Sequence, residues 1–302
     1  MKNAIIYYYN IYVNDINKIN NDYYFVFNND DYVVTKYGYN VEDSLYMYFL
    51  NKEMISKGIN TYLILLTREN NVLFSYDDSL YFLMRIPKIK NRNIAFSDVI
   101  NFNFYTTDDK IIKNLDKSNW SYFWSNKIDY IEYQFSGVMD KYPSIRESIN
   151  YYIGLWENAI SYYNDNIDKE PIKLVAHKRV DSSMDLLSFL NPINLIIDTK
   201  ERDIGEYLKS FVINEKYTSD VLNRMLSYLD NEKIDTKRLI SRILFPSYYF
   251  DKYDDIMTGF NDEILIKDSS REGDSVLKLL NIIFNRYSNS NIPYIEWIKK
   301  ED

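Results

Sequence analysis

The residue types that most often do chemistry in proteins are scarce in this chain. None of the 302 residues is cysteine, so a disulfide framework, a zinc–thiolate site and a cysteine nucleophile are all excluded. The single histidine, His177, excludes metal sites built from several histidines, and no serine or aspartate motif near it supplies a nucleophile pairing. Only seven residues are glycine, about a third of the usual number, which argues against a glycine-rich phosphate loop. Carboxylates and amines are the remaining candidates.

Three charged side chains stand where secondary structure could fix their positions. Lys36 ends the run Val33-Val34-Thr35, Glu53 falls inside a helical pattern, and Asp198 follows the apolar run Leu195-Ile196-Ile197. On the residues alone, Lys36 is expected to be an exposed hairpin lysine and Glu53 a surface residue of its helix. Asp198 is expected to be a helix N-cap or a loop residue after a buried strand, an interpretation that competes on equal terms with a role as a site residue. The surrounding elements therefore decide whether these residues form a site.

The first ninety residues predict a β-rich unit that contains one helix. Aromatic and β-branched runs on either side of Asn28–Asp31 are typical of a β-hairpin, and Gly58 stands where a helix C-terminal cap is expected. The expected order is strands 23–27 and 32–36, helix 41–57, strands 61–66 and 72–76 as a second hairpin, and strand 80–86.

Helices dominate the chain after Pro87. Residues 88–118 are polar and of mixed type, and short apolar runs occur at 174–176 and 195–197. Helices are expected at 120–141, 144–165, 203–214, 217–230, 235–244 and 274–286. The prediction is an α+β fold with a small β-rich N-lobe, residues 1–87, and a larger, mainly helical C-lobe, residues 88–302.

Composition and charge narrow the class of protein further. Apolar residues make up 46% and charged residues 26%, so the chain can bury a sizeable core. The net charge of −8 and the absence of a basic face predict that the protein does not bind nucleic acid. No signal peptide and no membrane-spanning run is seen, so we expect no membrane partner and a cytoplasmic protein, or one retained on a structure built inside a cell.

Three stretches carry a resemblance to a known family. They are Asn150–Ile160 (NYYIGLWENAI), Val175–Arg179 (VAHKR) with Leu195–Glu206 (LIIDTKERDIGE), and Arg242–Phe250 (RILFPSYYF). Their order and spacing are similar to those of the spore-coat-associated kinase-like proteins of endospore-forming Firmicutes, the CotS type. That family lies within the aminoglycoside phosphotransferase and protein-kinase-like superfamily. The resemblance extends from about residue 20 to residue 290, and it implies a bilobal protein-kinase-like fold.

The resemblance assigns kinase roles to several residues. Phosphoryl transfer needs a strand lysine on the nucleotide phosphates, a helix glutamate that holds it, and side chains that hold Mg²⁺. The implied nucleotide-binding residues are Lys36 and Glu53, with Glu42 as the other glutamate candidate, and the implied metal ligand is Asp198. ATP and Mg²⁺ are the cofactors this site would take, although no cofactor follows from the residues themselves.

The catalytic loop departs from the family pattern. Active phosphotransferases carry His-Gly-Asp and, five residues after the Asp, Asn; here these two positions hold Arg179 and Met184. An arginine stays protonated and cannot accept a proton, and a thioether is a poor ligand for Mg²⁺. Asp181 and Asp185 are nearby carboxylates that could replace the missing groups only if the loop re-forms.

Two further loop residues are expected to be structural. His177 is implied to be a scaffold residue that hydrogen-bonds backbone or carboxylate groups, and Asp203 to have a structural role at the start of the next helix. The hairpin that would cover ATP, Asn17–Asp22, contains no glycine to let the backbone approach a phosphate.

Two functions follow from this pattern, of different classes. The first is a pseudokinase, a non-catalytic structural or interaction protein with protein partners, among them coat proteins, and a location in the spore coat. The cluster Trp120, Trp124, Tyr151, Tyr152 and Trp156 would serve as its contact surface if it is not helix–helix core. The alternative is an active small-molecule phosphotransferase with an atypical loop.

If the resemblance is misleading, the chain is an unrelated α+β scaffold without a division near Pro87. Convergence of Lys36, Glu53 and Asp198 on one cleft would secure the kinase ancestry and leave ligand binding open, whereas a solvent-facing Lys36 would remove even a vestigial nucleotide site.

Overall fold

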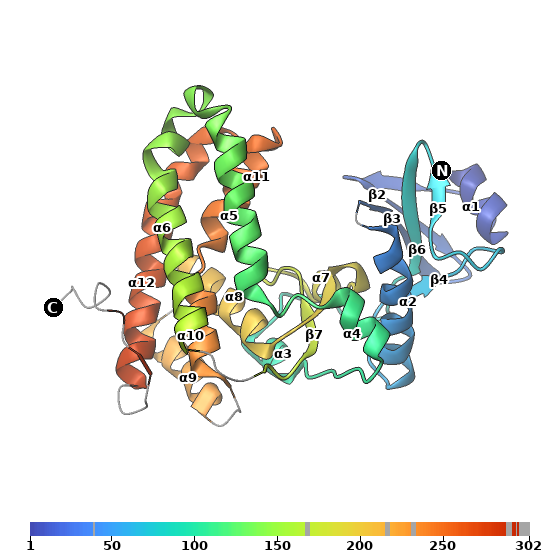
Figure 1. The fold of residues 1–302 in the computed structure, drawn as a ribbon. Coiled ribbons are helices and arrows are strands. Elements are labelled where there is room, and N and C mark those ends of the chain that lie inside the picture. Colours follow the sequence, from blue (N-terminus) through green and yellow to red (C-terminus); the bar gives the residue numbers. More distant parts are fainter. Residues whose placement is uncertain are drawn as a thin grey trace.

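The computed structural model divides into a β-rich N-terminal lobe and a larger helical lobe, as the sequence predicts (Figure 1). It describes residues 1–38, 40–166, 170–214, 218–230, 234–287, 292–293 and 295. The last strand of the first lobe ends at Arg85 and the next helix begins at Phe96, so the predicted boundary at Pro87 falls in the connection between them.

One antiparallel sheet forms the N-terminal lobe. Its strands are β1 (Asn17–Ile19), β2 (Asp22–Phe27), β3 (Asp30–Tyr37), β4 (Leu63–Leu65), β5 (Phe74–Tyr76) and β6 (Ser79–Arg85). The spatial order is β1-β2-β3-β6-β4, and β5 also pairs with β6. Two helices belong to this lobe, α1 (Lys2–Tyr9) and α2 (Val41–Ser56).

The alternation of side chains along β3 separates two small cores. Val33 and Tyr37 share a core with Leu50 and Met54 of α2, whereas Val34 shares a core with Ile5 of α1. Because successive side chains of a strand point to opposite faces, odd-numbered residues of β3 face α2 and even-numbered residues face α1. This register decides below where Lys36 can reach.

Asn and Asp supply the backbone conformations for which many hairpins use glycine. The β2–β3 turn is Asn28-Asn29, with φ of 50° and 62°, and the β5–β6 turn is Asp77-Asp78, with φ of 51° and 53°. Such positive φ values at both turn residues give the tight turn that matches strand twist, and Asn and Asp adopt them at low cost. The predicted hairpin around residues 28–31 is therefore confirmed in a chain that is poor in glycine.

The predicted pairing of the second hairpin is wrong. The strands expected at 61–66 and 72–76 exist as β4 and β5, but both pair with β6 rather than with each other. Leu63 lies opposite Arg85 and Phe74 opposite Tyr81, so the two short strands lie along successive parts of β6. Asn51 of α2 fixes β4, because its Nδ2 donates to the Tyr62 carbonyl (2.7 Å) and its Oδ1 accepts from the Ile64 amide (3.1 Å).

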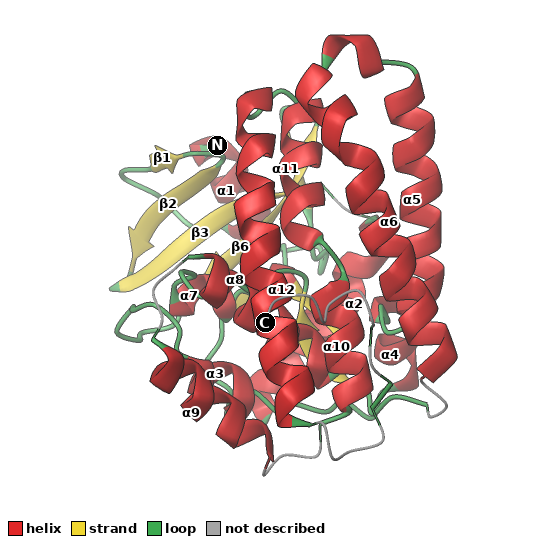
Figure 2. Ribbon diagram, turned by 90° about the vertical axis from the view of Figure 1, so that its left-hand side faces the viewer, coloured by secondary structure: helices red, strands yellow, loops and turns green. Residues whose placement is uncertain are grey.

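The second lobe consists mainly of helices, with one short hairpin of β7 (Leu174–His177) and β8 (Leu195–Asp198). Its helices are α3 (Phe96–Asn101), α4 (Asp109–Leu115), α5 (Trp120–Ser136), α6 (Pro143–Asn166), α7 (Leu186–Phe189), α8 (Lys200–Ile213), α9 (Ser219–Asp230), α10 (Thr236–Leu244), α11 (Ser247–Met257) and α12 (Ser269–Arg286), with the 3₁₀ turns η1 (Met139–Lys141), η2 (Pro192–Asn194) and η3 (Glu263–Asp268). Figure 2 shows α5, α6 and α12 as long, roughly parallel rods, with α8 and α10 at their base.

The aromatic cluster singled out in the sequence is largely core. Trp120, Trp124, Tyr152 and Trp156 are buried, and only Tyr151 is exposed, at 55%. The interpretation of these side chains as helix–helix packing therefore holds for four of the five. Among the described residues, no helix is both long enough and apolar enough to cross a membrane.

Candidate functional site

The β7–β8 hairpin holds the loop that carries the only histidine. The His177 side chain is fully buried, and its Nδ1 lies 2.6 Å from Asp203 Oδ2. Asp203 Oδ1 also accepts from the His177 backbone amide (3.0 Å), and the ring stacks on Phe189 with centroids 4.0 Å apart. These contacts are those of a structural residue that holds the loop in place. Asp203 bonds this loop instead of capping α8, whose N-cap position is Thr199.

Asp198, the predicted metal ligand, is sealed inside the protein. Its carboxylate accepts from Trp120 Nε1 (2.9 Å) and from the Thr199 amide (2.7 Å), and it forms an ion pair with Arg202 Nη1 (3.0 Å). Burial raises the pKa of Asp198 to about 6, although Arg202 and Arg242 act in the opposite direction. A Mg²⁺ ion needs accessible oxygen ligands, so it would have to displace Arg202 and open the core. The residues at this position do not fit Mg²⁺.

Arg179, which the resemblance aligns with the catalytic carboxylate, projects to the surface. Its Nη2 lies 3.0 Å from Asp251 Oδ1 on α11, and its backbone amide donates to Asn194 Oδ1 (3.2 Å). Burial raises the pKa of Asp251, and the nearby Arg179 opposes this shift. A cation therefore bridges from this loop to α11.

The two carboxylates that could replace the missing groups have local structural contacts. Asp185 caps α7, because its carboxylate accepts from the Ser188 amide (3.1 Å) and hydroxyl (2.6 Å). Asp181 accepts from the Ser183 amide (2.7 Å), and Met184 packs against the helical core. Each of these bonds closes a turn, so the loop as folded does not direct Asp185 to the position of the missing amide.

Lys36 and Glu53 are not brought together, which corrects the predicted nucleotide site. Lys36 is exposed and, by the register of β3, shares the face of Tyr32 and Val34, away from α2. Glu53 instead pairs with Lys57 (2.6 Å) and accepts from the Thr106 hydroxyl (2.6 Å). The β3 residue that faces α2 beside Lys36 is Thr35, which cannot hold a phosphate by charge. Glu42, the other candidate, is exposed in the first turn of α2.

Acidic and phenolic groups gather on the face of the sheet that carries Thr35. Burial raises the pKa of Tyr62, and the nearby Tyr24, Asp185 and Asp22 raise it further. Burial also raises the pKa of Asp22. Carboxylates from both lobes, Asp22 and Asp185, thus lie close enough to Tyr62 to raise its pKa.

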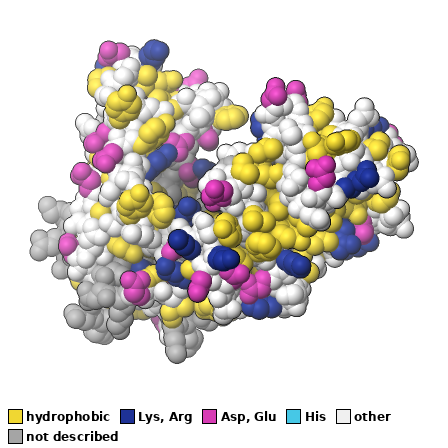
Figure 3. All heavy atoms as spheres, turned by 45° about the vertical axis from the view of Figure 1, so that its right-hand side comes forward, with side chains coloured by type: hydrophobic (Ala, Val, Ile, Leu, Met, Phe, Trp, Pro, Cys, Tyr) yellow, Lys and Arg dark blue, Asp and Glu magenta, His cyan; other side chains and the backbone are white. Residues whose placement is uncertain are grey.

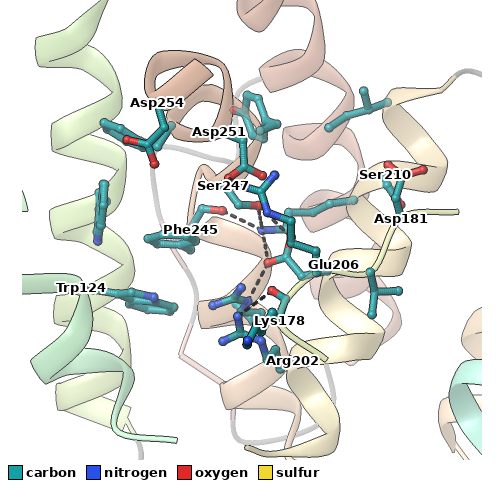
Figure 4. Close-up of a pocket in the computed structure, with 18 of the residues that line it drawn as sticks. Trp124, Lys178, Asp181, Arg202, Glu206, Ser210, Phe245, Ser247, Asp251 and Asp254 are labelled. Atoms are coloured by element: carbon teal, nitrogen blue, oxygen red, sulfur yellow. Dashed lines mark hydrogen bonds and ion pairs between the residues drawn. The ribbon is translucent and has the colours of Figure 1, made fainter. Parts of the chain in front are cut away.

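A pocket of about 660 Å³ adjoins the loop on its helical side. It lies between α5, α8, the start of α11 and residues 178–181. Figure 3 shows the molecule hollowed between its two lobes, with basic and acidic side chains around the hollow. Figure 4 shows Trp124 and Phe245 on one side of the pocket, Asp181 and Ser210 on the other, and dashed lines converging near Glu206.

The buried end of this pocket is a charged cluster that the sequence patterns did not single out. Glu206 Oε1 lies 2.6 Å from Arg242 Nε and 2.9 Å from Lys209 Nζ. Lys209 also donates to the Phe245 carbonyl and to Ser247 Oγ, both at 2.8 Å. Arg242 and Lys209 are almost completely buried.

The electrostatics of this cluster follow from burial and pairing. Burial alone would raise the pKa of Glu206, but Arg242 and Lys209 lower it to about 2. Burial lowers the pKa of Lys209 to about 8 against the pull of Glu206. A signal for the cluster exists in the sequence, since Lys209 and Arg242 each interrupt the apolar stripe of a helix, where an unpaired charge would be costly.

No metal centre is assembled by the described part of the chain. Within those residues, no group of three or more His, Cys, Asp or Glu side chains is placed to hold an ion. Because Asp198 is also buried and paired with Arg202, the pocket beside α8 is a better candidate for a ligand site than a metal centre is.

Comparison with protein families identifies the group to which the chain is related. The family described as "Spore coat putative kinase YutH" matches residues 2–263. The chain belongs to this family. A curated relative, the endospore coat-associated protein YutH of Bacillus subtilis (strain 168), is 25% identical over 213 residues. The match covers 61% of this chain and 61% of that relative's length.

Solved structures show the same fold. An aminoglycoside phosphotransferase from Alicyclobacillus acidocaldarius is similar with a TM-score of 0.64 over 96% of this chain and 97% of its own, at 8% identity. A spectinomycin phosphotransferase in complex with ADP and spectinomycin gives a TM-score of 0.57 over 90% of this chain and 97% of its own, at 12% identity. The predicted kinase-like fold is confirmed, and the unrelated scaffold is excluded.

Proposed function

We propose that this protein is a non-catalytic, kinase-like component of the spore coat that acts through contacts with coat proteins. Membership of the YutH family and the coat association stated for the Bacillus subtilis relative support the location. The fold alone does not set an activity, because function lies in the site residues.

The observation that carries the non-catalytic part is the sealed state of Asp198. Its oxygens already accept from Trp120 and Thr199 and pair with Arg202, while Arg179 replaces the proton acceptor and pairs with Asp251. A phosphotransferase would need both carboxylates free to hold a metal and accept a proton. The engagement of Asp198 by Arg202 and the arginine at position 179 therefore support a non-catalytic role.

Nucleotide binding tests this part directly. We expect the melting temperature of the purified protein to stay unchanged in about 5 mM ATP with Mg²⁺. A protein that bound ATP at this concentration would be stabilised, and its melting temperature would rise measurably. Asp198→Asn is the matched variant, since it keeps the shape of the side chain. A Mg²⁺-dependent rise in melting temperature in the wild type that is lost in Asp198→Asn would overturn the proposal.

A row of exposed apolar side chains supports the contact with another protein. Val41, Leu45 and Phe49 are 55%, 44% and 43% exposed, and their spacing of four residues places them on one side of α2. Exposed apolar residues that line up in this way mark contact surfaces more often than isolated ones do.

Localisation in a sporulating host tests the partner. A fluorescent fusion of the full chain is expected to concentrate at the coat, and the double variant Leu45→Glu/Phe49→Glu to remain diffuse. Ile172→Glu is the control, because Ile172 is 69% exposed but lies outside this row. Equal coat localisation of all three proteins would contradict a role for the α2 row, and diffuse wild type would contradict the coat assignment.

A further inference from the structure

The pocket beside α8 carries a charge opposite to that of the chain. Its lining contains eight Lys or Arg and five Asp or Glu side chains, a net charge of +3, against −8 for the whole sequence. Asp198, which pairs with Arg202, lowers the local excess to +2 when it is included. In a pocket with low-dielectric walls, such an excess of positive charge produces a strong local electrostatic potential that favours an anionic ligand.

Arg242 leaves hydrogen-bonding capacity unused at the buried end of the pocket. Its Nε pairs with Glu206, and its guanidinium lies 5.2 to 5.8 Å from the ring centres of Phe245, Trp120 and Trp124. The side chain is only 5% exposed, and the contact of its Nε with Glu206 Oε1 lacks hydrogen-bond geometry, so this buried N–H has no hydrogen-bond partner among the described residues. A guanidinium fork is suited to carboxylate and phosphate oxygens.

Trp156 supplies a second, independent indication. The side chain is fully buried, lines the same pocket, and its Nε1 has no hydrogen-bond partner among the described residues. The indole N–H can only donate, so the group that would satisfy it is an acceptor. Buried polar groups are rarely left without a partner, and each exception calls for an explanation.

The remaining wall of the pocket is flat and aromatic. Trp124 stacks on Phe245 with ring centres 4.5 Å apart and planes within 8° of parallel. Trp156 packs against Phe245 and Phe250, with ring centres 4.7 and 4.3 Å apart, respectively. A volume of about 660 Å³ is in the range of pockets that bind organic molecules. Such a wall favours a ligand with an apolar, planar body next to its polar group.

We propose that this pocket binds a small organic anion, a carboxylate or a phosphate ester with an apolar ring body, whose anionic group lies at Arg242 and Trp156. Such a ligand would provide acceptors for the unused donors of both side chains and would compensate the excess positive charge. The assignment goes beyond the proposed function, because it gives a ligand class to a pocket that the non-catalytic role does not use.

Calorimetric titration with three ligands of equal ring size tests the proposal. The probes are 1-naphthyl phosphate, 1-naphthoate and 1-naphthylmethylamine, each added to the full chain without nucleotide or Mg²⁺. We expect the better of the two anions to bind at least about tenfold more tightly than the amine, and the order of the anions to identify the phosphate or the carboxylate. Two anions that bind no more tightly than the amine would overturn the proposal.

Three variants locate the binding. Trp156→Phe keeps an aromatic side chain, although a smaller one, and removes the N–H. We expect it to weaken binding of the better anion about tenfold, the usual effect of a lost hydrogen bond to a charged group. Arg242→Gln is expected to weaken it further, whereas Arg286→Gln, which removes the same charge at the Asp230 ion pair on α12, should have no effect.

The variants also separate the alternatives. Unchanged affinity in Trp156→Phe, or equal weakening by Arg286→Gln and Arg242→Gln, would overturn the assignment of the site. Trp156→Phe keeps the test decisive even if Arg242→Gln fails to fold, because it leaves the Glu206 ion pairs intact. The titrations contain no nucleotide, so they succeed or fail independently of the ATP experiments.

Discussion

At the scale of single residues, Gly205 shows how the charged cluster limits the sequence. A Cβ atom at Gly205 would lie 2.9 Å from Cγ and 3.2 Å from Cβ of Arg242. Both atoms are at the base of the side chain, which cannot swing away without moving its helix. The glycine in the middle of α8 is therefore explained by the approach of α10 and not by backbone conformation.

Gly205→Ala should therefore destabilise the fold. An alanine normally gains about 1 kcal/mol over glycine inside a helix, but displacement of Arg242 is expected to outweigh this and give a net loss of about 1–2 kcal/mol. Gly154→Ala in α6 is the matched control, because no atom lies within 4 Å of its added Cβ, and it should stabilise by up to about 1 kcal/mol. Urea unfolding measures both variants, and stabilisation by Gly205→Ala would contradict the predicted clash.

The charged cluster also predicts a pH dependence of stability. The pKa of Glu206 is about 2 in the folded protein against an ordinary value of 4.5. A carboxyl whose folded pKa is depressed contributes stability above its unfolded pKa, and this contribution is lost as the pH falls through the folded pKa. Glu206→Gln should be less stable than the wild type at about pH 7. As the pH falls from about 5 to about 3, the wild type should lose more stability than this variant does.

Thermal unfolding across this pH range measures the difference. Glu147→Gln, at an exposed position of α6, is the control and should follow the wild type. Parallel curves for the wild type and Glu206→Gln would show that Glu206 does not hold the two cations in the way the distances indicate.

The sequence predicted some site residues in their correct surroundings and misplaced others, for physical reasons. His177 and Asp198 lie on the short hairpin at the centre of the fold, as their apolar neighbours suggested. Lys36 is exposed, as the residues alone predicted, whereas the resemblance assigned it to a nucleotide site. Residues 32–37 are mostly apolar or β-branched, so the run itself does not reveal which face of the sheet each side chain takes. One residue of register moves a side chain to the opposite face.

At the scale of elements, the helix α2 and the hairpin β2–β3 could be predicted because their signals are local. Asn40 caps the first turn of α2, Gly58 with φ of 84° ends it, and Asn28-Asn29 form the hairpin turn. The pairing of β4 and β5 could not be predicted, because both strands have only three residues and take their partner from β6. Long-range pairing of this kind leaves no trace in the spacing of apolar residues.

Several helices were missed for a different reason. α1 (KNAIIYYY) is rich in residues that favour strands, and burial of Ile5 against the sheet stabilises it as a helix. α3, α4 and α11 are short, and they lie in segments where aromatic or polar residues hide the helical period. Tertiary packing decides the conformation of such segments.

Asn51 provides a test of how α2 holds the sheet. Asn51→Leu would leave the Tyr62 carbonyl and the Ile64 amide buried without their side-chain partner, and we expect a loss of about 2–4 kcal/mol in the free energy of unfolding. Lys52→Leu, at the exposed neighbouring position, should change it by less than about 0.5 kcal/mol. If both variants unfold at the same urea concentration, Asn51 does not link α2 to β4.

At the scale of the whole molecule, the chain has the two-lobe architecture of phosphotransferases, and the proposed loss of phosphoryl transfer rests on a few residues within it. The fold agrees with solved phosphotransferases over nearly the whole chain. Within it, Lys36 lies on the face of the sheet opposite α2, Arg179 pairs with Asp251, and Asp198 pairs with Arg202. These three arrangements are the basis of our proposal that the kinase-like scaffold is non-catalytic.

Turnover of ATP tests this central claim most directly. The γ-phosphate of ATP can be followed by ³¹P NMR over a day in the presence of Mg²⁺ and the full chain, with Asp198→Asn and protein-free samples beside it. The structure predicts that the wild type consumes ATP no faster than Asp198→Asn or the protein-free sample. A Mg²⁺-dependent loss of the γ-phosphate that occurs with the wild type and is abolished in Asp198→Asn would contradict the account.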